Sequence, residues 1–177
     1  MKNKRERMTI IILGLLVVAL LLGGCTAAST DTGDMSLSDI VERLYNGVDV
    51  PAYETITLTK DMFESYAFTS YDESLSAVAA DALVNITPHS LVVIHAGNGN
   101  GKELAEEIIL NADPNKWLCV GSEIVEVTYT DHYVVLVMSD EITADAIVSN
   151  FKNMTKELDD MEANVLTAGN NRHDENF

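Results

Sequence analysis

A glycine-rich run, Gly97–Gly101 (Gly-Asn-Gly-Asn-Gly), lies between a predicted strand and a predicted helix and is followed by Lys102. Backbone N–H groups at such a helix start can bind phosphate. The run is not a Walker A loop, because it is one residue short and Glu103 stands where a serine or threonine would hold magnesium. We interpret it as a strand-to-helix turn that uses glycine for positive φ, and keep three residues as candidates for binding a small ligand: Gly97, Gly99 and Gly101.

Three histidines, His89, His95 and His132, have the side chains that a zinc site would need. No two of them have the usual ligand spacing on one element, so we predict no metal site. His95 alternates with Leu91 and Val93 on one face of a predicted strand, which indicates a buried, hydrogen-bonded imidazole. We place His89 in a loop and His132 in a turn, and retain His95 as a ligand-binding candidate.

Cys119, combined with a histidine and an aspartate from elsewhere, would provide the parts of a thiol hydrolase. It lies in the apolar string Trp117–Val120, which predicts a small buried residue, whereas nucleophilic cysteines need an exposed, electropositive position. The acidic groups at 103–107 and 159–162 match no calcium loop and indicate solvated faces. We therefore predict no catalytic residues, no cofactor and a protein that is not an enzyme.

The N-terminus indicates attachment of a lipid. A basic segment at residues 2–7 precedes the stretch Ile10–Leu22, 13 positions that are apolar apart from one glycine. This is the layout of a secretory signal, and it is shorter than the roughly 20 residues of a membrane-spanning helix. The end of the segment, Leu22–Cys25, resembles a bacterial lipobox. The resemblance implies cleavage between Gly24 and Cys25 and a diacylglycerol on the Cys25 sulfur. The alternatives are an uncleaved membrane helix and an ordinary signal in which the cysteine is incidental.

The chain is strongly acidic, with 11 basic and 28 acidic residues and a formal net charge of −17. Loss of residues 1–24 would remove four basic residues and one acidic residue, which leaves a net charge of −20. Phosphate backbones require a basic patch, so we expect no nucleic-acid partner. After lipidation Cys119 would be the remaining cysteine, so we predict that packing holds the domain together without an intramolecular disulfide.

The rest of the chain predicts one α+β domain over residues 37–157. Residues 25–36 are small and polar and predict a lipidated cysteine with a flexible tether. Two short helices follow, over Leu37–Leu44 and Thr59–Tyr66, with an extended stretch between them and a loop at 68–76. Residues 158–177 are polar and predict a frayed or disordered tail.

The central part has the predicted order β-β-α-β-β-α. The expected elements are strands over 82–86 and 91–96, a helix over 102–110, strands over 123–130 and 133–138, and a final helix that starts at Ser139 or Asp140. Short connections favour antiparallel hairpins, so we predict a small antiparallel sheet of about four strands. Both central helices are expected on one face of the sheet, with the two N-terminal helices on the other.

The strings Pro88–His95, Trp117–Val120 and Asp131–Ser139, together with the glycine run and its glutamate-rich helix, resemble an uncharacterised lipoprotein family of Gram-positive bacteria that has a single domain of unknown function. The resemblance covers Leu37–Met154. It implies a lipid anchor and a single α+β domain, and it assigns no catalytic residues.

These observations predict a lipoprotein at the extracytoplasmic face of the cell membrane of a Gram-positive-type bacterium. Its expected role is that of a non-enzymatic accessory or binding module that docks a protein or envelope component. One alternative is a lipoprotein that binds a small ligand or metal through the glycine run or the histidines. Another is an envelope hydrolase, which would require Cys119 or an acid pair to be exposed in a cleft.

Overall fold

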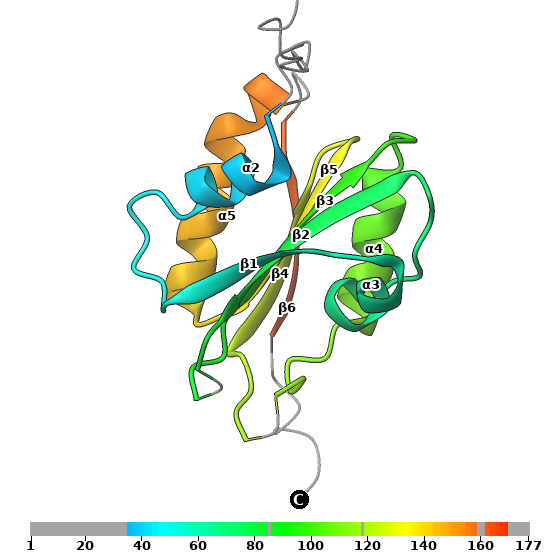
Figure 1. Cartoon of the computed structure of the whole chain (residues 1–177). Coiled ribbons are helices and arrows are strands. Elements are labelled where there is room, and N and C mark those ends of the chain that lie inside the picture. Colours follow the sequence, from blue (N-terminus) through cyan, green and yellow to red (C-terminus); the bar gives the residue numbers. More distant parts are fainter. Residues whose placement is uncertain (1–34, 85, 118, 159–161, 170–177) are drawn as a thin grey trace, which may run out of the picture. The chain divides into compact units, whose positions relative to one another are not determined.

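A six-stranded sheet in the order β1-β2-β3-β5-β4-β6 forms the centre of the computed structural model (Figure 1). The structure describes residues 35–84, 86–117, 119–158 and 162–169, all within the unit Met35–Phe177. The predicted secretory signal, residues 1–24, and Cys25 lie outside the described residues. Within the described part, no helix is long and apolar enough to cross a membrane.

The elements follow one another along the chain as two N-terminal helices that alternate with strands, two hairpins that are each followed by a helix, and a last edge strand. Their bounds are α2 Leu37–Leu44, β1 Tyr53–Thr57, α3 Lys60–Ala67, β2 Leu75–Ala82, β3 Ser90–Ala96, α4 Gly101–Asn111, β4 Ile124–Tyr129, β5 Tyr133–Ser139, α5 Glu141–Leu158 and β6 Asn164–Gly169. Every strand pair is antiparallel. The α+β class and the antiparallel sheet are therefore as the sequence predicts.

Helices cover both faces of the sheet, which gives two separate apolar cores. One core packs under α3 and α4 and includes Phe63, Val92 and Ile108. The other packs under α2 and α5 and includes Leu44 and Phe151. Figure 1 shows α2 and α5 on the left of the sheet and α3 and α4 on its right. The prediction that α4 and α5 share a face is wrong. The connections β3–α4–β4 and β5–α5–β6 cross the sheet in the same direction while β3 and β5 run antiparallel, so right-handed crossovers place the two helices on opposite faces.

Residues at the helix starts explain where two of the helices begin. The Ser36 hydroxyl accepts a hydrogen bond from the Asp39 N–H, and the Asp39 carboxylate accepts one from the Ser36 N–H, which forms a capping box at α2. At α5 the Asp140 carboxylate accepts a hydrogen bond from the Thr143 N–H at 2.9 Å. Both caps were within the range that the sequence predicts.

The strand boundaries differ from the sequence prediction at three places. β2 covers Leu75–Ala82, whereas the sequence predicts a loop at 68–76 and a strand at 82–86. β2 is rich in alanine, which is a poor strand former and gives little signal. β1 lies in the stretch predicted only as extended. β6 lies within the predicted polar tail, so the tail prediction is wrong for Asn164–Gly169: these residues pair with β4 along its whole length.

Candidate docking surface

The glycine run forms the turn from β3 to α4, as predicted. Gly99 has φ +68°, and the N–H groups of Gly97, Gly99 and Gly101 donate to the carbonyls of Ser74, Ala96 and Asp131 at 2.8–3.0 Å. A Cβ on Gly101 would lie 2.1 Å from the Thr130 carbonyl oxygen. The three glycine N–H groups are thus already bonded to backbone oxygens, and the absence of a side chain at Gly101 serves close packing of the helix start on the β4–β5 turn.

His95 and His132 lie at the same end of the sheet as the glycine run. Their ring centroids are 6.3 Å apart, and His95 also contacts the Tyr133 ring at 5.1 Å. The sequence predicts a buried His95, but it is only half-buried, because β3 ends one residue later and its imidazole packs against an exposed turn residue. Among the described residues, no three His, Cys, Asp or Glu side chains form a group that could hold a metal.

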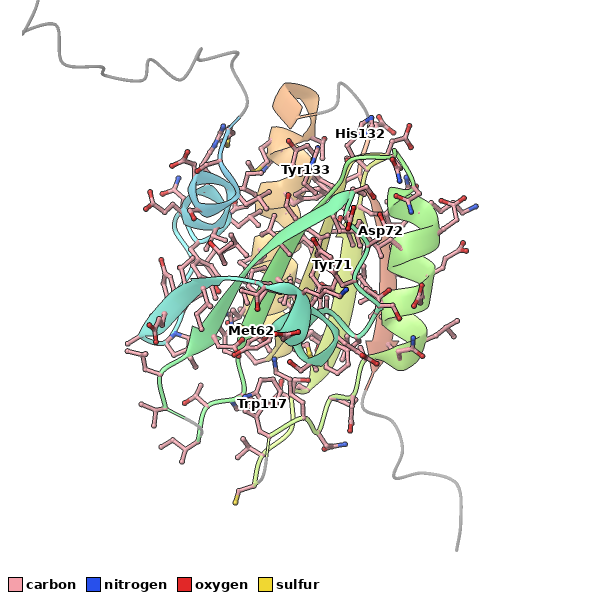
Figure 2. All side chains as sticks on the ribbon, turned by 45° about the vertical axis from the view of Figure 1, so that its right-hand side comes forward. Met62, Tyr71, Asp72, Trp117, His132 and Tyr133 are labelled. Carbon is pink, nitrogen blue, oxygen red and sulfur yellow. The ribbon has the colours of Figure 1, made fainter. Side chains whose placement is uncertain are left out.

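Cys119 is exposed, which contradicts the predicted buried position. It belongs to a long connection between α4 and β4, residues 112–123, in which the sequence predicts Trp117–Val120 as a core-like string. In this connection Trp117 supplies the partly buried packing and the thiol is left outside. Figure 2 shows Trp117 at the end of the molecule opposite to His132. The exposed thiol and the pair His95 and His132 therefore lie at different ends of the sheet.

The structure places three exposed aliphatic side chains in the connection between β2 and β3. Leu83, Val84 and Ile86 have exposed fractions of 60, 55 and 77%. We call these three residues the apolar loop. Leu83 donates its N–H to the Ala52 carbonyl, and Thr87 donates to the Val84 carbonyl, so the backbone is tied back while the side chains point outward. The sequence predicts a core strand here, because an apolar string gives the same pattern in a strand as in a protruding loop.

Lys116 fastens the α4–β4 connection beside the apolar loop. Its ammonium donates to the Ser90 hydroxyl at 2.7 Å and lies 3.7 Å from Asp81 Oδ1, an oxygen that has no hydrogen-bond partner in the described part. The ammonium also lies 5.5 Å from the Tyr66 ring centroid and 5.0 Å from that of Trp117. Burial lowers the pKa of Lys116, and the Asp81 carboxylate opposes this shift. Sequence reasoning missed this group, since a single lysine beside an apolar string carries no distinctive signal.

A buried polar chain supports the other side of the apolar loop. The Tyr45 hydroxyl lies 2.8 Å from His89 Nε2, and His89 Nδ1 lies 3.0 Å from the Ser139 hydroxyl oxygen. Ser139 donates to Asp140 Oδ2 at 3.3 Å. Burial lowers the pKa of His89 to about 4. These hydrogen bonds link the residue after α2, the residue before β3 and the last residue of β5. Because Tyr45, His89 and Ser139 are all buried, they present no reactive group to solvent.

The apolar loop therefore exposes hydrophobic side chains, and residues next to it are held by side-chain hydrogen bonds. Lys116 anchors the α4–β4 connection next to it, and the contacts of His89 with Tyr45 and Ser139 hold the end of the connection that leads into β3. An exposed apolar side chain is ordinary when it stands alone. Three within four positions form a local patch of the kind found at interaction surfaces.

Comparison of the chain with protein-family models, with curated proteins and with solved structures finds no match.

Proposed function

We propose that this protein is a lipid-anchored, extracytoplasmic binding module that docks a protein through the apolar loop. The leader and Cys25 support the anchoring part of the proposal. The exposure of Leu83, Val84 and Ile86 is the observation that supports docking. Full burial of one such side chain is worth roughly 1.5–3 kcal/mol. At the observed exposures, covering all three would contribute on the order of 3–6 kcal/mol to association before its entropic costs.

The other functions expected as alternatives receive less support from the geometry. A phosphate ligand at the glycine run would compete with three backbone hydrogen bonds. A hydrolase built on Cys119 gains the exposure that it needs, but His89 is buried and bonded to Tyr45 and Ser139. His95 and His132 lie at the opposite end of the sheet. We therefore retain a non-enzymatic docking role.

Lipid anchoring is tested by replacing Cys25, and the chain offers a matched control in its other cysteine. Cys25→Ala should abolish incorporation of labelled fatty acid and release the protein from the membrane fraction. Cys119→Ala should be labelled and retained like the wild type. Labelling that persists in Cys25→Ala, or is lost in Cys119→Ala, would refute anchoring through Cys25.

Docking is tested by making the apolar loop polar. The triple variant Leu83→Ser, Val84→Ser, Ile86→Ser removes only exposed side chains, so its unfolding temperature should stay close to that of the wild type. After chemical crosslinking of intact membranes, the triple variant should lose a crosslinked species that the control Leu110→Ser, from an 84% exposed position on α4, keeps. An unchanged set of crosslinked species in the folded triple variant would rule out docking through this loop.

A further inference from the structure

Exposed carboxylates lie at the same end of the sheet as the apolar loop. Glu54 pairs in register with Asp81 beside the loop. Glu123 donates its N–H to the Ser139 carbonyl next to His89, and its carboxylate accepts the N–H of Glu141 at 3.4 Å. We call the exposed acidic residues that these contacts place at this end the acidic rim: Glu54, Asp113, Glu123, Asp140 and Glu141.

Positive charge is placed elsewhere in the described part of the chain. Lys116 is the lysine at this end, and its ammonium is occupied by Ser90 and Asp81. The other described lysine and arginine residues lie on α2, at the start of α3, at the start of α4 and in the second half of α5. An incoming surface therefore meets aliphatic side chains framed by negative charge.

Resting on the proposed docking function, we propose that the partner is a protein whose apolar cleft is framed by lysine and arginine side chains. The apolar loop fills the cleft, and the acidic rim pairs with the basic frame. Complementary charge of this kind sets the rate and specificity of association, while the buried apolar contacts hold the complex. The site therefore favours a basic protein partner over a neutral one.

A lipid surface fits this end of the molecule poorly. Anionic headgroups would repel the acidic rim. The fold also places the apolar loop away from the start of the domain: in Figure 1 the connection between β2 and β3 lies at the lower end of the sheet, whereas α2 begins at the upper end. The apolar loop therefore lies at the end of the sheet opposite to the start of α2.

A second copy of the chain is also a poor occupant. A symmetric contact through the apolar loop would bring one acidic rim against another. Like charges brought together in an interface cost several kcal/mol in general, and the whole chain already carries a net charge of −17. The charge pattern thus selects an unlike, basic protein.

The experiment uses the full-length chain in its native membranes, with the photo-crosslinking amino acid benzoylphenylalanine at position 86. The adduct is identified by mass spectrometry, and its initial rate of formation is measured at about 0.15 M and at 1 M salt, between which the Debye length falls from about 8 Å to 3 Å. A charge-neutralised form carries Glu54→Gln, Glu123→Gln and Glu141→Gln. A matched control neutralises three exposed carboxylates on other parts of the domain: Glu42→Gln, Glu73→Gln and Glu103→Gln.

If the partner is a basic protein, benzoylphenylalanine at position 86 should form one discrete adduct with it. Its rate of formation should fall by about tenfold or more in 1 M salt and in the rim-neutralised form, since steering by charge accelerates association by roughly 10- to 1,000-fold. The control should stay within about twofold of the wild type. A protein adduct that is insensitive to salt and to rim neutralisation would overturn the basic-partner inference and leave docking intact. Adducts with lipid or with a second copy would overturn the inference as well. Failure to form any adduct would refute the docking function itself.

Discussion

Acidification should destabilise the fold through His89. The imidazole is 1% exposed and its pKa is lowered to about 4, from 6.5 in an unfolded chain. Burial is the main cause. The charge of Lys116 also lowers the pKa, while those of Asp81 and Asp140 act in the opposite direction. Between pH 6.5 and pH 4 the unfolded chain therefore binds a proton at this histidine that the folded protein does not bind.

The sign and size of the effect follow from this difference. Well above pH 6.5 the His89 imidazole is neutral in both the folded and the unfolded state, so its protonation costs the folded state no stability. As the pH falls below 6.5 the free energy of unfolding decreases, and the loss is complete below about pH 4. Each pKa unit is worth about 1.4 kcal/mol, so His89 should account for a loss of about 1 kcal/mol by pH 5.5 and about 3 kcal/mol when titration is complete.

The measurement is equilibrium urea unfolding between pH 7.5 and pH 4, for the wild type, His89→Gln and His132→Gln. The many carboxylates contribute a background that all three proteins share, so the difference between their pH profiles isolates each histidine. His89→Gln should be less stable at pH 7.5 and should lose less stability on acidification. His132→Gln, at an exposed turn, controls for the replacement of a histidine by glutamine. Parallel profiles for the wild type and His89→Gln would refute the assignment of a buried, neutral His89.

Three further predictions concern packing and exposure. Lys116→Met should lower the free energy of unfolding by about 2 kcal/mol, because the buried Ser90 hydroxyl loses its charged donor and Asp81 loses its cation. Urea unfolding at neutral pH that shows no change would contradict the anchoring role of Lys116. Gly101→Ala should cost more than about 2 kcal/mol, since the new Cβ would overlap the Thr130 carbonyl, and a fully stable variant would show that the turn is looser than described. Cys119 should react with a maleimide as fast in the folded protein as in urea; marked protection in the folded state would restore the buried position that the sequence predicts.

The elements with strong local signals could be predicted from the sequence. The helix over Leu37–Leu44 combines a capping serine with apolar residues at helical spacing, and its bounds are as predicted. β5 is an uninterrupted apolar run, and every residue in it is buried. The hairpin turn at Asp131 and His132 also lies where expected. In each case a contiguous segment contains the whole signal, so no distant contact was needed to recognise it.

The features of the candidate site depend on contacts between distant segments and could not be predicted in this way. The apolar string at 82–86 is as suitable for a core strand as for a protruding loop, and only the pairing of β2 with β3 leaves Leu83, Val84 and Ile86 outside. Cys119 is exposed because Trp117, two residues earlier, takes the partly buried position. His89 is buried because α2, which lies more than 40 residues earlier, supplies Tyr45.

The amino-acid sequence by itself determined the α+β class, the antiparallel hairpins, the acidity of the chain and the prediction of lipid attachment at Cys25, because composition and local periodicity are properties of contiguous residues. The tertiary structure alone decided which apolar residues remained outside the two cores. Burial is a property of packing across the sheet: once helices cover both faces, each apolar segment either faces a helix or remains exposed. The apolar loop and its acidic rim are therefore products of the tertiary structure.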